Sequence, residues 1–211
     1  MSPSAPARPP RHFGRRSWRS VEFASLDFET TGLDPRRDHI LSFGVVPIRE
    51  GRIVMSDGVY REVAPAVPPS PVSVTVHGLR HVDLAAARDL DAERGVLGAA
   101  LHRRFIIAWA AEVEAAFLAT TFGGSARSWR RRIVDVLVLA RLADELQGAG
   151  GSPSYALTAA AERFGVPVHS PHDAFDDALT TAQVFLVVAT RLSATPSTAR
   201  WFLRASRSGR I

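Results

Sequence analysis

Two carboxylates at the end of an apolar segment constrain this chain more than any other feature. Residues 21–28 are rich in Val, Phe and Leu and predict a buried or half-buried strand that stops at a Thr-Thr-Gly turn. Because side chains on a strand alternate, Asp27 and Glu29 point to the same face. Two carboxylates so close together in apolar surroundings repel each other and favour a cation between them. A polar strand end at the rim of a sheet has the same pattern, so the pair alone leaves both interpretations open.

A second acidic segment opens the last long helix, which we expect over residues 171–192. Ser170 is the expected N-cap, with Pro171 at the first helical position. Asp173 and Asp176 are then explained as first-turn carboxylates, which accept hydrogen bonds from free backbone N–H groups and complement the helix dipole. This part of the acidity therefore has a purely structural explanation.

His172 and Asp177 lie in the same segment but are not needed for capping. Five residues correspond to about 140° around a regular helix, so the two side chains can share a site only near the helix start. A histidine in this position is more often a surface residue, and that alternative stays open.

The remaining elements predict an α/β protein with a sheet of mixed direction. A hairpin turn at Glu50-Gly51 joins the second and third strands into an antiparallel meander with the first. The expected strands are residues 21–28, 40–49, 52–63, 105–109 and 133–136, and the expected helices are residues 84–104, 110–121, 137–147, 155–164 and 171–192.

Composition narrows the class of protein. The chain has 211 residues, of which 46% are hydrophobic, enough for one well-cored domain. It has no cysteine, which excludes disulfides and thiolate metal sites. Apolar stretches of membrane-spanning length and the apolar core of a signal peptide are both missing. We therefore expect a soluble, cytoplasmic protein that does not bind a membrane.

Charge divides the chain into three parts. Residues 1–20 and 178–211 each hold five Arg and no acid, whereas residues 21–177 carry a net charge of −5. Basic ends around an acidic centre suit a protein that holds a polyanion. Solvated tails are the alternative, and we prefer it for residues 1–20, which we expect to be disordered. The domain is expected over residues 21–192, followed by a basic tail over 193–211 that has room for a short helix.

The order of the motifs is specific. Asp-x-Glu-Thr-Thr-Gly-Leu-Asp-Pro at residues 27–35, followed far along the chain by His-x-Ala-x-x-Asp-Ala at residues 172–178, resembles the DEDDh 3′–5′ exonucleases. That family includes the proofreading epsilon subunit of DNA polymerase III, ribonuclease T and oligoribonuclease. The resemblance implies a ribonuclease H-like α/β fold, with a mixed five-stranded sheet flanked by helices.

The middle motif of the family is altered here. Residues 105–118 resemble its apolar strand and following helix, with Glu114 at the position of an aspartate and Trp109-Ala110 in place of His-Asn. Glu is one methylene longer than Asp and could act after a small adjustment. The alternative is a surface residue on a helix, which would leave the enzyme slow or inactive.

The resemblance assigns a role to each acidic residue. Asp27 would bridge two Mg²⁺ or Mn²⁺ ions, Glu29 and Asp177 would bind the first, and Glu114 would act on the second through water. His172 would be the general base that accepts the proton of the attacking water, with a pKa suited to neutral pH. Oxygen ligands of this kind select such hard cations.

Substrate contacts also follow from the resemblance. Thr30 and His77 would contact the terminal nucleotide, and Leu33 and Val76 would wedge against its base. Each residue has a structural alternative: a turn for Thr30, and core packing for Leu33 and Val76. Asp135 is interpreted as a helix cap and not as a ligand.

The implied function is hydrolysis of phosphodiester bonds from a free 3′ end, single-stranded or frayed, with release of nucleoside 5′-monophosphates. DNA is slightly preferred over RNA as the substrate. Two alternatives stay open: an inactive domain of the same fold that binds nucleic-acid ends, and an unrelated α/β protein with a structural cation site. A polymerase partner and a homodimer are both left undetermined by the sequence.

Overall fold

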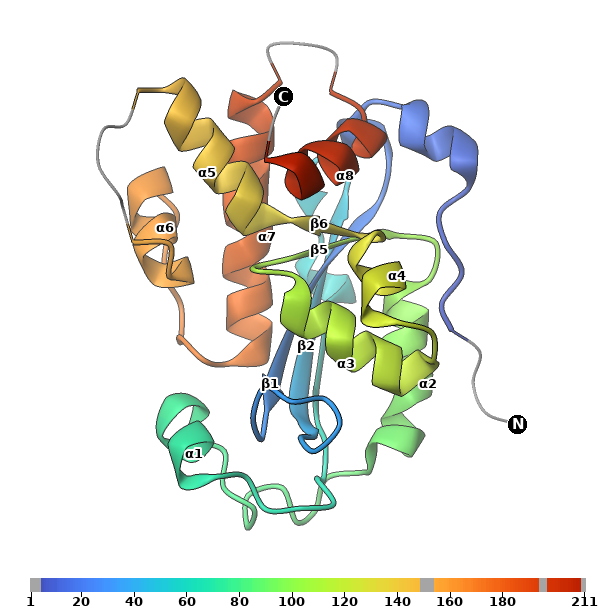
Figure 1. The fold of residues 1–211 in the computed structure, drawn as a ribbon, viewed down its shortest axis with the longest axis vertical. Coiled ribbons are helices and arrows are strands. Elements are labelled where there is room, and N and C mark those ends of the chain that lie inside the picture. Colours follow the sequence, from blue (N-terminus) through green and yellow to red (C-terminus); the bar gives the residue numbers. More distant parts are fainter. Residues whose placement is uncertain (1–4, 149–153, 194–196, 210–211) are drawn as a thin grey trace.

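One mixed sheet organises the molecule (Figure 1). The computed structural model describes residues 5–148, 154–193 and 197–209. The strands in this part of the chain are β1 (Phe23–Thr30), β2 (Ile40–Arg49), β3 (Arg52–Ile53), β4 (Val59–Glu62), β5 (Phe105–Ala108) and β6 (Ile133–Asp135). Their order is β3-β2-β1-β5-β6, and β4 also pairs with β2. The pairs β1–β5 and β5–β6 are parallel and the others antiparallel, so the expected mixed sheet is confirmed.

The sheet has one strand more than expected, because the segment 52–63 is split. A 3-10 turn, η3 (Met55–Asp57), separates β3 from β4. The hairpin turn before β3 is confirmed: Glu50 and Gly51 both have positive φ, 52° and 69°. Two successive residues with positive φ match the twist of the flanking strands in a tight hairpin.

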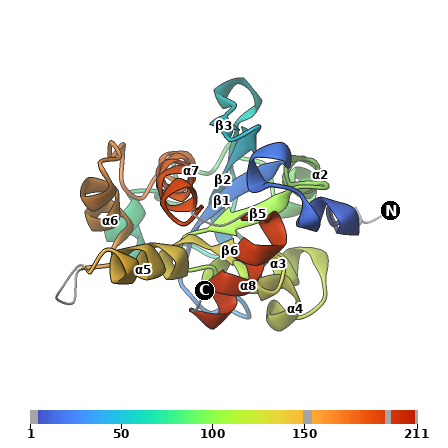
Figure 2. The same ribbon diagram turned by 90° about the horizontal axis from the view of Figure 1, so that it is seen from above.

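Helices cover both faces of the sheet. They are α1 (Pro71–His77), α2 (Leu90–Leu101), α3 (Glu112–Phe122), α4 (Ala126–Arg130), α5 (Val136–Leu146), α6 (Leu157–Phe164), α7 (Ala174–Arg191) and α8 (Ala199–Ser208). Seen from above, α5, α6 and α7 lie on one side of the sheet and α2, α3 and α4 on the other (Figure 2). Each side has its own hydrophobic core. Within the described residues, no helix is both long and apolar enough to cross a membrane.

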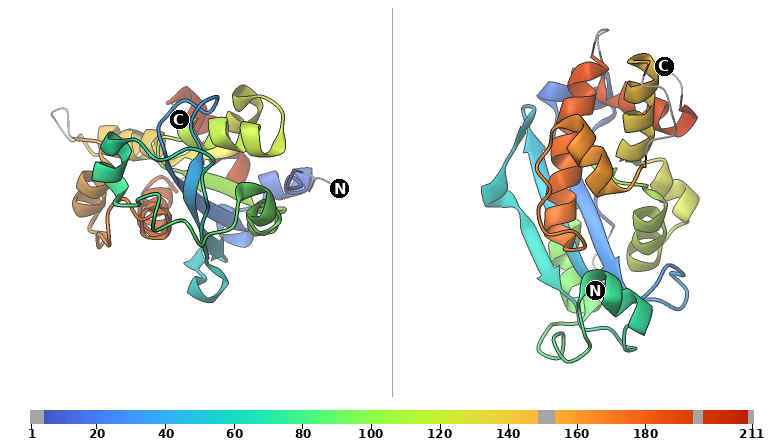
Figure 3. Two further views of the ribbon diagram at one scale, coloured as in Figure 1. Left: turned by 90° about the horizontal axis from the view of Figure 1, so that it is seen from below. Right: turned by 90° about the vertical axis from the view of Figure 1, so that its left-hand side faces the viewer.

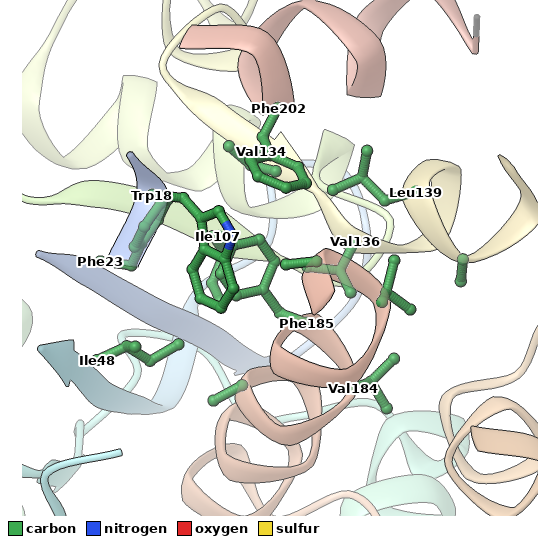
Figure 4. Packing of buried hydrophobic residues seen from close by; sticks show 14 of the residues in the cluster. Trp18, Phe23, Ile48, Ile107, Val134, Val136, Leu139, Val184, Phe185 and Phe202 are labelled. Carbon is green, nitrogen blue, oxygen red and sulfur yellow. The ribbon is translucent and has the colours of Figure 1, made fainter. Parts of the chain in front are cut away.

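The N-terminal segment differs from the expected disordered tail. Short 3-10 helices form at η1 (Arg11–Arg15) and η2 (Trp18–Ser20). Trp18 is 3% exposed and packs edge-on against the rings of Phe185 and Phe202 (Figure 4). Its indole N–H donates to Ser193 Oγ at 3.0 Å. Burial of this tryptophan offsets part of the entropy lost on ordering this Pro- and Arg-rich segment, which the average composition of residues 1–20 did not indicate. Residues 1–4 lie outside the described part.

The C-terminal segment also belongs to the core. The short helix expected in residues 193–211 is α8, and Phe202 on its buried face is completely enclosed beside Phe185. The boundary predicted at residue 192 therefore does not end the packed domain in the structure. Residues 194–196 and 210–211 lie outside the described part.

Two helix starts also differ from the prediction. α7 begins at Ala174, because Asp173 and not Ser170 is the N-cap: its carboxylate accepts from the N–H groups of Phe175 and Asp176. α2 begins at Leu90 rather than at residue 84, and its N-cap is Asp89. In α7 an aspartate further along the chain takes the N-cap position that the sequence assigned to Ser170.

Candidate active site

The central strand β1 carries the first two candidate ligands. Asp27 and Glu29 are two residues apart, and the backbone pairing of β1 with β2 sets them opposite Gly44 and Ser42. Glu29 is 8% exposed, whereas Asp27 is partly buried. Both carboxylates lie near the carboxyl end of β1, where the chain leaves the sheet.

Gly44 allows α7 to approach the strand pair closely. A β-carbon on Gly44 would lie 2.1 Å from the carbonyl oxygen of Ala174 and 2.5 Å from Cα of Phe175. Only glycine fits at this contact, since a methyl group would overlap backbone atoms. The first turn of α7 therefore packs against β2 at Gly44, the residue that pairs with Asp27. Sequence reasoning missed this role, although a glycine inside an apolar strand is a signal of close backbone approach.

The turn before α7 places His172 and Asp177 together. The backbone N–H of His172 donates to Asp177 Oδ2 at 3.1 Å. His172 has φ 64°, a left-handed conformation that is uncommon for a non-glycine residue. This turn and the cap at Asp173 bring a residue outside the helix next to one inside it. Two residues that are far apart around an ideal helix thus reach the same site.

These side chains converge with Glu29. Ligand atoms of Glu29, His172 and Asp177 all lie within 4.8 Å of one another. Glu29 is buried, Asp177 partly buried and His172 exposed, so the group opens to solvent on the histidine side. Asp27 adjoins the group, because the charges of Glu114, Glu29 and Asp177 all raise its pKa.

Glu114 points inward from the second residue past the start of α3. Its side chain is buried, with a residue exposure of 4%, and its Oε2 has no hydrogen-bond partner among the described residues. Burial raises its pKa to about 8. The structure thus does not place Glu114 on the solvent-exposed face of the helix, which was the alternative left open by the sequence.

Asp135 fixes the start of α3, and its expected role as a cap is confirmed. Its Oδ1 accepts from the N–H of Val138, capping α5 at 3.2 Å, and its Oδ2 accepts from the N–H of Ala111 at 3.2 Å. Arg130 donates to the same Oδ2 at 2.9 Å. One buried carboxylate therefore joins the turn before α3 to the start of α5.

Burial and mutual repulsion raise the pKa values of the carboxyl groups in the acidic cluster. Burial is the main cause of the high pKa of Asp27, followed by the charges of Glu114 and Glu29. Burial and the charge of Asp177 raise the pKa of Glu29 to about 8, and burial also raises the pKa of Asp177. Carboxylate oxygens with an orphaned buried atom among them are the donor set of a hard divalent cation. The residues present therefore fit the metal that the sequence implies.

A groove of about 410 Å³ adjoins the acidic cluster. The four candidate substrate residues, Thr30, Leu33, Val76 and His77, all line it, as do Glu29 and Glu114. Its other wall is α1, which lies at the lower end of the molecule (Figure 1; Figure 3, right).

The exposure of these residues shows which of them pack in the core. Leu33 is 76% exposed and Val76 is 47% exposed, so neither packs in the core. His77 lies against the backbone of Thr30, and burial lowers the pKa of its imidazole. Thr30 has a turn role as well, since its hydroxyl donates to the carbonyl of Gly32 at 2.7 Å. Val72, which is 76% exposed on the same wall, is a further lining residue that the sequence did not single out.

Comparisons with known proteins agree on one family. A family model described as exonuclease matches residues 25–185. The PolC-type DNA polymerase III of Thermotoga petrophila is 32% identical over 171 residues, which are 81% of this chain and 12% of that protein. The PolC-type enzyme of Thermotoga maritima is 33% identical over 165 residues, 78% of this chain and again 12% of that protein. The chain thus spans about an eighth of the length of these relatives.

Solved structures show the same fold. Exonuclease I of E. coli, in a zinc-bound complex with single-stranded DNA, superposes with a TM-score of 0.71 over 83% of this chain and 42% of that chain, at 18% identity. Exonuclease I in complex with a dT13 oligonucleotide gives the same TM-score of 0.71.

Proposed function

Since this chain belongs to the DEDDh-type 3′–5′ exonuclease family, we propose that it hydrolyses phosphodiester bonds one nucleotide at a time from the 3′ end of nucleic acid. The observation that carries the proposal is the convergence of Glu29, His172 and Asp177 within 4.8 Å, with Asp27 and Glu114 beside them. All four acids have raised pKa values. Their mutual repulsion destabilises the fold, so a purely structural role does not explain why they lie together.

Asp27, Glu29 and Asp177 would hold two Mg²⁺ or Mn²⁺ ions, with Glu114 acting through water. Bound there, the two ions would lower the pKa of a water molecule and neutralise charge on the phosphoryl oxygens. The inward direction and burial of Glu114 support this assignment, although it stands where the family has aspartate.

His172 is the proposed general base. Its side chain is exposed at the open side of the cluster, where it can accept a proton from the attacking water and release it to solvent. The hydrogen bond from its backbone N–H to Asp177 holds the residue against the ligands.

The groove is the proposed site of the terminal nucleotides. Leu33 and Val76 offer exposed apolar surface on which bases can stack or wedge, and Thr30 and His77 lie between that surface and the carboxylates. A single strand or a frayed end suits this groove, because unpaired bases are free to contact apolar side chains. The proposed products are nucleoside 5′-monophosphates.

DNA is the proposed substrate in preference to RNA. The support comes from relatives that are DNA polymerases by name and from structural neighbours with bound single-stranded DNA. A polymerase context and a cytoplasmic location are parts of the same proposal. The burial of Glu114 and its charge interaction with Asp27 support an active enzyme over a domain that only binds ends.

The proposal is tested with 5′-labelled single-stranded DNA, 3′-mismatched duplex and single-stranded RNA, each incubated with Mg²⁺ or Mn²⁺. We expect a ladder of shortening from the 3′ end that disappears with EDTA and in the Asp27→Ala and His172→Ala variants. Asp57→Ala is the matched control, because Asp57 is an acid on the surface, ion-paired with Arg49 away from the site. Wild-type protein that shortens none of the three substrates in either metal would overturn the proposal.

A further inference from the structure

A second cavity lies at the end of the sheet away from the acidic cluster. It has a volume of about 340 Å³ and is lined by Phe105 and Ile106 at the start of β5. Phe105 pairs with Phe23 on the parallel strand β1. Asp27 is four residues further along β1, which places it roughly 13 Å up the strand at 3.3 Å per residue. The two sites therefore do not share a wall.

Arginine dominates this cavity, which we call the arginine pocket. Its six arginines come from the N-terminal segment, the loop before β5, the loop before β6 and the start of α8: Arg8, Arg11, Arg104, Arg131, Arg132 and Arg200. In Figure 1 the short helix η1 of the N-terminal segment and α8 lie near each other at the upper end of the molecule. Among the described residues, no Asp or Glu lines the pocket.

The positive charge of the pocket is barely compensated. In the described part of the chain, Arg104 alone of the six makes an ion pair, at 3.0 Å to Glu22. Burial, followed by the charge of Arg8, lowers the pKa of Arg132 to about 10. Like charges around a concave surface raise the free energy of the folded state unless an anion joins them.

Arg132 is held in place without an anion. Its Nη2 donates to the carbonyl of Pro6 at 2.8 Å, and its guanidinium lies 3.9 Å from the ring centroid of Trp129. A guanidinium fixed by stacking loses little entropy when it binds a ligand, so this part of the pocket is pre-organised.

We propose that the arginine pocket binds phosphate groups, as an anion site separate from the acidic cluster. Guanidinium groups form paired hydrogen bonds with phosphate oxygens, and a phosphate has enough oxygens for several arginines at once. A carboxylate has only two oxygens and one charge, so it can bind fewer of the six arginines that line the pocket. The volume is within the range of small-ligand sites, roughly 300–1,000 Å³.

The phosphate has two chemically equivalent sources: the backbone of a nucleic acid, or a free polyphosphate compound. The proposal does not depend on exonuclease activity, because binding is measured in EDTA, where no hydrolysis occurs. Failure of one proposal therefore leaves the other intact.

The test titrates inorganic triphosphate into the full chain in EDTA and follows tryptophan fluorescence and the melting temperature. We expect Arg8→Gln/Arg200→Gln to raise the Kd at least tenfold. Arg52→Gln/Arg127→Gln is the matched control: it removes the same charge at exposed sites outside the pocket and should change the Kd by less than twofold. Both arginines of the test variant are exposed, so the fold should tolerate it, and its unliganded melting temperature should equal or exceed that of wild type.

Two further arms define the ligand. Competition of triphosphate by a dT oligonucleotide identifies the nucleic-acid backbone as the source, and lack of competition identifies a free phosphate compound. Polyglutamate of matched charge should bind at least tenfold more weakly than triphosphate. Three results would each overturn the proposal: no binding of triphosphate to wild type, equal losses in the test and control variants, or polyglutamate binding as tight as triphosphate.

Discussion

A β-carbon on Gly44 would lie 2.1 Å from the carbonyl oxygen of Ala174, so the first turn of α7 rests directly on the backbone of β2. Because Gly44 pairs with Asp27, this contact sets the distance between the carboxylates of β1 and the residues at the start of α7. The proposed active site therefore depends on a residue that has no side chain.

Gly44→Ala should separate the two halves of the site. The methyl group must displace α7, and overpacking of this kind costs about 1–3 kcal/mol. We expect a lower melting temperature and at least a hundredfold loss of exonuclease rate. Gly95→Ala is the matched control, because nothing lies within 4 Å of a β-carbon there and Ala favours a helix. An active, stable Gly44→Ala variant would show that α7 does not need this contact.

Glu114→Gln should reduce the exonuclease rate at least a hundredfold without lowering stability. The substitution keeps the shape of the side chain and removes a buried carboxyl group whose Oε2 has no partner among the described residues. Glu112→Gln on the same helix is the control, since the side chain of Glu112 is 73% exposed and pairs with Arg130. Single-turnover rates and melting curves measure both effects. Activity of Glu114→Gln equal to that of the control would remove Glu114 from the site.

Stability without metal should fall as pH rises from about 5 to about 8. The pKa of Glu29 is about 8 in the folded chain against 4.5 for an unperturbed glutamate. Between these values the folded state keeps a proton that the unfolded state has lost, so raising the pH favours unfolding. Each kcal/mol of stability lost lowers the melting temperature of a chain of this size by roughly 2–4 °C.

Added Mg²⁺ should reverse this trend, because it binds the ionised cluster of the folded state. Its stabilising effect should therefore be larger at pH 8 than at pH 5, as measured by melting curves in EDTA and in excess metal. Glu29→Gln should flatten the dependence on pH. A melting temperature in EDTA that rises between pH 5 and pH 8 would contradict the proposed burial of uncompensated acids.

Leu33→Ser should weaken substrate binding and leave the fold intact. Leu33 is 76% exposed in the groove, so its loss removes a contact to a base and little core packing. We expect KM for single-stranded DNA to rise about 3–10-fold, which is the effect of one apolar contact of ~1 kcal/mol. Val82→Ser, at a site 70% exposed outside the groove, should change neither KM nor kcat. Equal effects of both variants would argue against a base contact at Leu33.

Part of the structure could be predicted from residues that are close together in the sequence. The alternation of side chains in residues 21–28 was enough to put Asp27 and Glu29 on one face, and a short apolar run was enough to find β5. The cap at Asp135 followed from its place before a helix. Each of these inferences uses neighbours within a few residues of the chain.

What escaped prediction depends on contacts between distant residues. Trp18 orders the N-terminal segment through Phe185 and Phe202, which lie far along the chain. The close contact of Gly44 with α7 likewise depends on tertiary packing. The start of α7 was misplaced because Ser170 and Asp173 are both able to cap, and only the packed turn decides between them.

The left-handed backbone conformation of His172 lowers thermal stability at a residue that we propose is needed for activity. A φ of 64° costs less backbone energy for asparagine or glycine than for histidine. Either replacement should therefore raise the melting temperature while removing the proposed base. A search for heat-resistant variants of this chain would therefore select against its proposed chemistry at this one position.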